Sequence, residues 1–537
     1  MNITVFLPFA ALLEPPPVVP WVGDLRVTGS GKMLATDVDV FSTVTILSIW
    51  LASVVIVFAT VQKLWVLRWN AGRDDSIDLP LPKGSMGLPL VGETLHWFVQ
   101  GADFHSSRRE RYGNVFKTHL LGRPVVRVTG GENVRRILLG EHQLVMSQWP
   151  QSTRRLLGGS TLANSVGDIH RFKRKVMAPV LSHSALESYL PSIQTVVRDA
   201  VSSWSTALTP TTVYPACKRL TFRIAVRVLL GFSPSDAELE NLGQVFEQFV
   251  ENLFSLPFDL PFSGLRKGIN ARNKLHMFLE KFIQEKLDKG ETKDYLDALD
   301  ILISSANQHD KGMSMLELKE AVVELIFAAY STTASASTSL ILQLLKHPAV
   351  LTKLQEEIVD AGLSPPSTAG PDDQGLSLSS IMGLNYLDWV IKEVLRLLPP
   401  VSGGYRTALK TFELDGFQIP KGWGVMYSIR DTQDMAAAFS SPQHFDPERF
   451  SPARREDAKE RFSYLPFGGG VRSCLGKELA KVIIKVLAIE LASSCSWELA
   501  SQSFPQMHAV PIVHPVDGLL VCFRPLAPED RATEARA

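Results

Sequence analysis

Apolar residues recur at helical spacing along most of the chain between residues 131 and 400. In ALESYLPSIQTVVRDAVSSW and NKLHMFLEKFIQEKLDKG they return every three or four positions, which predicts amphipathic helices. Residues 316–346 predict a longer helix, which is uncharged from Leu325 to Leu345 but contains seven serines and threonines. A helix with so many hydroxyl groups is expected inside protein rather than in lipid.

Strand patterns are shorter and fewer. VFKTHL and PVVRVTG predict a hairpin, and residues 405–429 predict short strands around an Asp-Gly turn. Residues 361–380 are rich in proline, glycine and serine and predict a loop, whereas residues 477–492 predict a last helix. These patterns indicate a mainly α fold with small β-sheets, built as one domain.

The most hydrophobic stretch lies near the N-terminus. Residues 40–62 carry no charge, and about 20 apolar residues suffice to cross a bilayer. Lys63 and Arg68 follow the stretch, so the positive-inside tendency places the rest of the chain on the cytoplasmic side. A cleaved signal peptide is the alternative, but its basic flank would come first and a small-residue cleavage site would follow. We therefore expect a transmembrane anchor.

The anchor divides the chain into further segments. We expect an N-terminal segment over 1–39, in which Met33 is the true start, and a basic flank with a Pro/Gly-rich hinge over 63–93. The main domain then covers 94–525, and a polar tail covers 526–537.

The composition of the chain disfavours some kinds of partner and some kinds of cysteine site. Acidic and basic residues number 55 each, so the net charge gives no indication of a nucleic-acid partner. None of the four cysteines forms a CxxC pair, which disfavours a paired-cysteine zinc site, and four in 537 residues make no disulfide scaffold. A reducing compartment fits this cysteine usage best.

One cysteine lies in an unusual loop, PFGGGVRSCLG, at residues 466–476. Cys474 comes just before the predicted 477–492 helix, whose N-terminus favours a thiolate, and Arg472 adds positive charge. This environment suits either a metal thiolate or a catalytic nucleophile with a helper histidine. The nearest histidine in sequence is His444, and a remote one could fold in, so both options remain.

The spacing of this loop, FxxGxRxCxG, resembles the haem-ligand loop of the cytochromes P450. The resemblance implies a cytochrome P450 fold over 94–525 and a haem whose iron is bound by Cys474. The matching positions, to which the family's haem contacts are carried over, are Phe467, Gly470, Arg472, Cys474 and Gly476.

Two further motifs resemble the same family, in the same order along the chain. Glu393 and Arg396 in IKEVLRLLPP match its ExxR helix, and FDPERF supplies Arg449, which implies a buried ion cluster that locks the fold behind the haem. FAAYSTTAS resembles the helix that crosses above the haem, where Thr332 matches the threonine that handles protons for dioxygen. Ser331 stands where an acid is usual, so it would act by ordering a water.

Other positions match family sites that bind the haem propionates or the substrate. For the propionates these are Arg472, Arg406 in SGGYRTALK and Arg174 in IHRFKRKV, where His170 replaces a tryptophan. For an apolar substrate they are Trp149, Phe327, Val401 and Ser402, with Phe254 and Phe262 near the entrance. Ordinary core packing is the alternative for Trp149 and Phe327.

Arg154 is a candidate for binding a substrate carboxylate, and FSLPFDLPFSG is expected to dip into the membrane.

Longer stretches resemble cytochrome P450 family 26, the vertebrate retinoic-acid hydroxylases, with SQWPQSTRRLLG and LRLLPPVSGGYRTAL most similar to the C-type member. The resemblance implies hydroxylation of all-trans-retinoic acid, mainly at C4, in the endoplasmic reticulum membrane. It also implies dioxygen and electrons from NADPH through cytochrome P450 reductase, which basic residues near Arg171 and Lys477 would meet. The alternatives are another lipophilic substrate (a sterol or fatty acid), a haem isomerase that uses no oxygen, and a retinoid-sequestering haem protein.

Overall fold

The structure is a computed structural model that describes residues 33–101, 103–232, 235–289, 297–307, 312–363 and 376–526. The chain divides into two compact units, residues 1–65 and 66–537. The predictions for residues 1–32 and for the tail lie outside the described residues, as does most of the predicted loop over 361–380.

The N-terminal unit is dominated by one long helix, α1 (Met33–Asn70). Its segment Ser42–Asn70 contains an 18-residue window with a mean hydropathy of 2.5 and is long and apolar enough to cross a membrane. The hydroxyls of Ser53 and Thr60 donate to the carbonyls of Ile49 and Ile56, four residues earlier, so these polar groups are satisfied within the helix. The predicted apolar span is therefore helical throughout.

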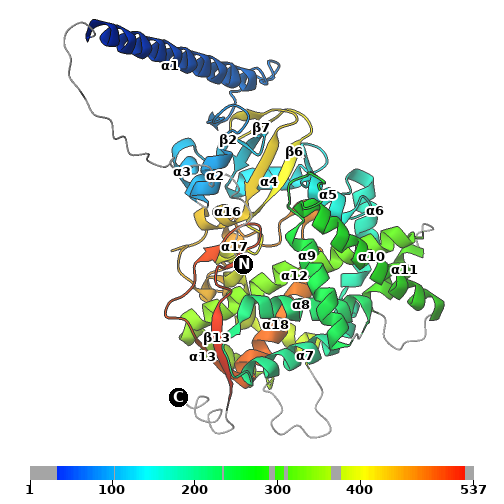
Figure 1. Cartoon of the computed structure of the whole chain (residues 1–537). Coiled ribbons are helices and arrows are strands. Elements are labelled where there is room, and N and C mark those ends of the chain that lie inside the picture. The colour runs from blue at the N-terminus through cyan, green and yellow to red at the C-terminus, as the bar shows by residue number, and fades with distance from the viewer. Residues whose placement is uncertain are drawn as a thin grey trace, which may run out of the picture. The chain divides into compact units, whose positions relative to one another are not determined.

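The second unit is built around the helix α12 (Met315–Lys346), which packs against α8 (Val213–Leu230) and α18 (Lys477–Ser494) (Figure 1). Helix α12 is also long and apolar enough to cross a membrane, but 67% of its most hydrophobic 18-residue window is buried in protein. The sequence interpretation of this helix as a buried one is confirmed. Two of its buried hydroxyl groups bond inside the fold: Thr338 donates to Ala334 O, and Ser335 donates to Val513 O.

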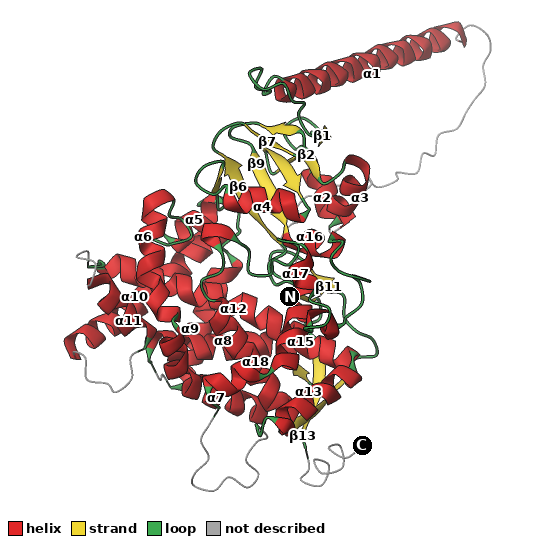
Figure 2. Ribbon diagram, turned by 180° about the vertical axis from the view of Figure 1, so that it is seen from behind, coloured by secondary structure: helices red, strands yellow, loops and turns green. Residues whose placement is uncertain are grey.

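The remaining helices surround this core or flank the sheets (Figure 2). The α-helices are α2 (Thr94–Gln100), α3 (Asp103–Tyr112), α4 (Gly131–Leu139), α5 (Gln151–Leu157), α6 (Gly167–Met177), α7 (His183–Ser205), α9 (Asp236–Glu251), α10 (Gly264–Lys289), α11 (Ala298–Asn307), α13 (Pro348–Asp360), α14 (Leu378–Gly383), α15 (Asn385–Leu397), α16 (Ile429–Met435) and α17 (Glu456–Lys459). Three short 3₁₀ turns are η1 (Ala178–Leu181), η2 (Pro447–Phe450) and η3 (Gly470–Arg472).

The largest sheet has six strands in the order β1-β2-β3-β9-β6-β4. They are β1 (Lys83–Gly84), β2 (Val115–Leu120), β3 (Arg123–Val128), β9 (Gly424–Ser428), β6 (Gly403–Ala408) and β4 (Val145–Ser147). The expected hairpin is β2–β3, whose strands pair antiparallel from Val115–Val128 to Leu120–Arg123. Strand β6 brings Arg406 opposite Ser147 of β4, which places this arginine beside the segment that follows α4.

Three smaller sheets complete the fold. They are β10 (Cys495–Leu499), β13 (Leu520–Pro525) and β5 (Thr211–Thr212); β11 (Met507–His508) with β12 (His514–Pro515); and β7 (Phe412–Leu414) with β8 (Phe417–Ile419). The last pair is the predicted Asp-Gly hairpin. Asp415 and Gly416 both have positive φ, 53° and 76°, as a tight hairpin turn requires.

A buried ion cluster joins α15 to η2. Glu393 accepts from Arg396 Nε at 2.7 Å and from Arg449 Nε at 3.0 Å, and all three side chains are almost fully buried. Arg449 also donates to Glu456 at 2.7 Å and to the carbonyls of Ser440 and His444. The three residues of the predicted cluster therefore lie in mutual contact, and their nitrogens tie the segment 440–456 to α15.

Replacing Glu393 by glutamine should destabilise the fold strongly, because two buried guanidiniums would lose their shared carboxylate. Breaking one partner of a buried pair costs roughly 3–5 kcal/mol. Thermal unfolding of the detergent-solubilised full chain measures the effect. The matched control is Glu132→Gln, since Glu132 forms the same i,i+3 pair with Arg135 on the surface and should change the midpoint little. Equal midpoints for both variants would contradict the prediction.

Candidate active site

The cysteine-bearing loop is closed by its own backbone. Cys474 N–H donates to Phe467 O at 2.9 Å, and the turn η3 lies between these residues. Gly470 has a φ of 66°, and a Cβ there would come within 2.4 Å of Leu138 O. Glycine is therefore needed at this position both for its backbone conformation and for the close approach of α4.

The Cys474 side chain is exposed, yet enough protein atoms surround the sulfur for desolvation to raise the pKa of the thiol. The Gly476 N–H, Arg174 and Lys477 act in the opposite direction and favour the thiolate. The sulfur thus lies at the start of α18 beside positive groups. This arrangement fits a thiolate that binds a metal ion from one accessible side.

Three arginines from distant segments meet next to this loop. Arg174 of α6 donates to Ser473 O at 2.8 Å, and Arg472 donates to Ser165 O at 2.5 Å. Arg472 and Arg406 each donate from Nε to Glu141 at 2.6 Å. The structure therefore brings together the three arginines that the sequence indicated for the haem propionates. It adds a carboxylate that sequence reasoning missed.

Two histidines in the same cluster also fit the acidic groups of a haem. The rings of His142 and His170 lie 5.4 Å apart. His142 Nδ1 accepts from Gly167 N, so the proton belongs on Nε2, and neither His142 Nε2 nor His170 Nδ1 has a hydrogen-bond partner among the described residues. Buried N–H groups without an acceptor are rare. Together with the arginines they suit two carboxylates, so the residues present fit a haem.

One face of α12 is accessible although most of the helix is buried. Leu325, Ala328, Ala329 and Thr332 are accessible and follow the i, i+3, i+4, i+7 spacing of a single helical face. Thr332 Oγ1 donates to Ala328 O at 2.6 Å, the i−4 bond that a threonine above a haem can make. Ser331 is buried and lies off this face. The structure therefore does not bring Ser331 together with Thr332, although the sequence paired them.

Two buried glutamates of α12 bind the segment between α5 and α6. Glu320 accepts from Ser160 N at 2.7 Å, and Glu324 accepts from Leu162 N and Ala163 N at 2.7 and 2.6 Å. Burial raises the pKa of Glu324 to about 7, against the pull of these N–H groups. Sequence reasoning missed both residues, since a glutamate in a helix usually indicates a solvated face.

The residues expected to line an apolar pocket come from several segments. Trp149 is half-buried and its ring lies 6.4 Å from that of Phe254, while Phe327 is half-buried on α12. Ser402 donates to Ala509 O at 3.4 Å, which joins its loop to the β11–β12 hairpin, and Val401 beside it is exposed. The hairpin tip at Ala509 is a further candidate lining segment that the sequence did not indicate.

The segment 254–262 presents a row of exposed apolar side chains. They are Phe254, Leu256, Phe258, Leu260 and Phe262. Phe262 is 91% exposed, so it lies on the surface rather than in a pocket wall. Arg154 is exposed on α5, and nothing in the structure places it where a buried substrate carboxylate would lie.

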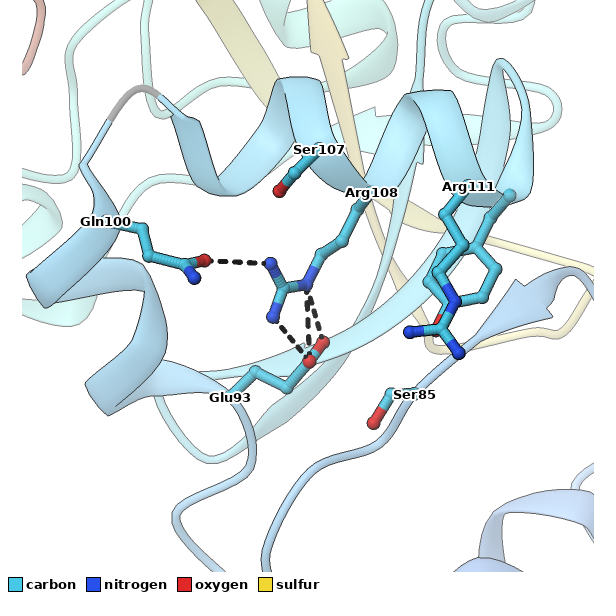
Figure 3. Close-up of a pocket in the computed structure, with 7 residues that line it drawn as sticks. Ser85, Glu93, Gln100, Ser107, Arg108 and Arg111 are labelled. Carbon is cyan, nitrogen blue, oxygen red and sulfur yellow. Dashed lines mark hydrogen bonds and ion pairs between the residues drawn. The ribbon is translucent and has the colours of Figure 1, made fainter.

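A separate pocket of about 500 Å³ lies between α2, α3 and β1 (Figure 3). Figure 3 shows Arg108 pointing at Glu93, with hydrogen bonds to its carboxylate and to Gln100. Arg108 and Glu93 are paired with each other, and none of the lining residues comes from the cysteine loop or α12. It is therefore not the active site.

Comparisons with known proteins agree with this geometry. A model of the cytochrome P450 family matches residues 82–523. Cytochrome P450 26B1 of Rattus norvegicus is 62% identical over 491 residues, which are 91% of this chain and 96% of that protein. Among solved structures, retinoic acid bound cyanobacterial CYP120A1 has a TM-score of 0.76 and 34% identity, and the match covers 84% of this chain and 100% of that chain.

The same comparisons correct one expectation. Cytochrome P450 26C1 of Homo sapiens is 59% identical over 87% of this chain and 93% of that protein, whereas human 26B1 is 60% identical over 91% and 96%. Similarity to family 26 is confirmed, but the expected greater likeness to the C-type member is wrong. Two short strings had indicated it, and identity over the whole chain outweighs them.

The protonation of Glu324 predicts a pH-dependent stability. The folded state binds this proton more tightly than the unfolded chain, whose glutamate pKa is near 4.5. The contribution of Glu324 to the free energy of unfolding should therefore fall as pH rises from about 4.5 to about 7, by at most about 1.4 kcal/mol per pH unit. Buried histidines such as His170, whose pKa is lowered to about 4, act in the opposite direction over part of this range. Glu324→Gln should therefore make the slope of the unfolding free energy against pH more positive than in the original chain, in denaturant titrations of the full chain.

The control variant is Glu317→Gln in the same helix. Hydrogen bonds from Ser314 lower the pKa of Glu317, so its contribution to stability is present above pH 4.5 and is lost only as pH falls further. The slope between pH 4.5 and 7 should stay as it is in the original chain. An unchanged slope in Glu324→Gln would show that Glu324 is not the group that titrates.

Proposed function

The chain belongs to the cytochrome P450 family, and from this we propose that it is a haem-thiolate monooxygenase that hydroxylates all-trans-retinoic acid, mainly at C4. The observation that carries the proposal is the closed loop that presents Cys474 beside three arginines and two histidines. The substrate class is supported by the similarity, at 34% identity, to a retinoic acid bound structure.

Each part of the site has a distinct role in this proposal. When bound, the haem supplies reductive activation of dioxygen. Cys474 would bind the haem iron, and its thiolate would donate electron density to it. Arg174, Arg406 and Arg472 would hold the propionates, and Phe467 would pack beside the ligand loop. These residues fix the reaction type and leave the choice of substrate to the other side of the site.

Thr332 would handle protons on the accessible face of α12. Its hydroxyl is anchored on Ala328 O and can still accept from, or relay to, a water held against that face. This feature favours oxygen chemistry over a haem isomerase, which needs no proton delivery to dioxygen. Ser331, which is buried, would act only by shaping the helix around Thr332.

A retinoid would lie against the apolar side chains that face the site. Trp149, Phe327 and Val401 would contact the polyene and ring, and Ser402 would position them through its bond to the β11–β12 hairpin. The exposed row over 254–262, with Phe254 in contact with Trp149, would touch the bilayer and connect it to the site. A lipophilic substrate could then enter from the membrane.

The electrons would come from NADPH through cytochrome P450 reductase. Arg171, Lys175 and Lys477 are exposed and could meet an acidic partner, whereas Lys173 is half-buried and bonded to Ser160 O. The anchor would place the enzyme in the endoplasmic reticulum membrane, with the catalytic unit facing the cytoplasm.

Full-length protein reconstituted in vesicles with reductase and NADPH should convert all-trans-retinoic acid to its 4-hydroxy product. Cys474→Ala should abolish this activity and the thiolate-type absorption of the carbon-monoxide complex. Cys522→Ala is the matched control and should keep both, since Cys522 lies in β13, away from the loop. Normal thiolate absorption without any oxidised retinoid in the original chain would contradict the proposed function.

Thr332→Ala should lower the rate of hydroxylation by about tenfold or more, because a positioned proton-transfer group is lost. Retinoic acid binding, followed by the spectral shift of the haem, should change little. Thr333→Ala is the control, since Thr333 is buried off the accessible face. If the two variants turn over equally, Thr332 has no role in proton delivery.

A further inference from the structure

Glu141, just after α4, is the carboxylate shared by two of the clustered arginines. Its side chain is 1% exposed, and its two oxygens are used separately. Oε2 accepts from Arg406 Nε, and Oε1 accepts from Arg472 Nε and from Ser147 N at 2.9 Å. The two guanidiniums come from positions 265 and 331 residues further along the chain.

On each of these arginines, one further nitrogen bonds to a backbone carbonyl and one has no protein acceptor in the part of the chain that the structure describes. Arg406 Nη1 donates to Tyr405 O, and Arg472 Nη2 donates to Ser165 O. Within the described residues this leaves Arg406 Nη2 and Arg472 Nη1 without a protein acceptor. A guanidinium is rigid and planar, so fixing two of its nitrogens fixes the direction of the third. Glu141 therefore determines where both free nitrogens point.

Charge gives a second argument. Arg174, Arg406 and Arg472 carry three positive charges, and the arginines beside Glu141 hold the pKa of its carboxyl below the ordinary value, so it is ionised. The cluster therefore has a net charge of plus two, since His142 and His170 are neutral at pH 7. A haem carries two propionates, and their two negative charges would neutralise the net charge of plus two.

We propose that Glu141 is a positioning residue for the haem: it orients Arg406 and Arg472 toward the propionates and sets the net charge of the cluster. The proposal rests on the proposed haem site but not on the identity of the substrate. Removing the carboxylate would release one arginine and add a positive charge near the iron. Added positive charge stabilises the reduced state, and a released arginine weakens propionate binding.

The test compares Glu141→Gln with the original full chain, both loaded with haem and without retinoic acid. Glutamine keeps an acceptor oxygen for one arginine, but its NH₂ group would face the other. The variant should show a reduction potential shifted to more positive values and a several-fold faster transfer of haem to an excess of apomyoglobin. Its carbon-monoxide complex should keep the thiolate-type absorption, because Cys474 is untouched.

Two further variants separate positioning from general damage. Glu141→Asp keeps the charge but is too short to reach both arginines, so it should retain the original potential and still lose haem faster. Glu490→Gln removes a buried carboxylate on α18 that pairs with Arg198 of α7, and it should change neither quantity. The proposal is overturned if Glu141→Gln keeps both the original potential and the original haem-transfer rate. It is also overturned if Glu141→Asp matches the original chain in both.

Failure of this inference is distinguishable from failure of the proposed function. A chain that binds no haem as a thiolate complex fails the proposed function before any variant is made. A chain with normal haem spectra and an unaffected Glu141→Gln variant fails only the inference.

Discussion

The fold depends on a single buried carboxylate, Glu393, between two guanidiniums. Arg396 and Arg449 are almost fully excluded from water, and desolvating two cations is costly unless each finds an anion and further acceptors. Glu393 supplies the anion, and the carbonyls of residues 440–444 supply the acceptors. Bonds from Arg396 to His444 O, and from Asp446 N and Arg449 to Glu393, hold α15 against the chain that leads into the cysteine loop.

A second buried carboxylate between two guanidiniums lies at the site itself. Glu141 lies between Arg406 and Arg472 as Glu393 lies between Arg396 and Arg449. The first cluster uses nearly all of its nitrogens on protein acceptors, whereas the second leaves a nitrogen on each arginine for a ligand. One arrangement therefore ties segments of the fold together, whereas the other, with its unused donors, is the one that we propose for the cofactor.

The two sides of the site are held by different forces. On the cysteine side, charged groups and closed backbone bonds fix positions closely, as the reaction requires. On the α12 side, apolar side chains and the loop bound by Glu320 and Glu324 surround the accessible face. Because burial raises the pKa of Glu324 to about 7, the charge on the carboxyl that binds this loop changes near neutral pH. In the proposed function, reaction type and substrate choice are thus carried by separate parts of the chain.

The sequence by itself determined the features whose information is local. The spacing around Cys474, the Asp-Gly hairpin and the hydroxyl-rich buried helix each follow from neighbouring residues, and the structure has the hairpin and the helix where the sequence predicts them. Only the tertiary structure decided which residues share a face or a partner. Glu141 and His142 carry no motif, and Ser331 lies off the face of Thr332. These outcomes depend on contacts between segments hundreds of residues apart, where burial and charge pairing select the partner.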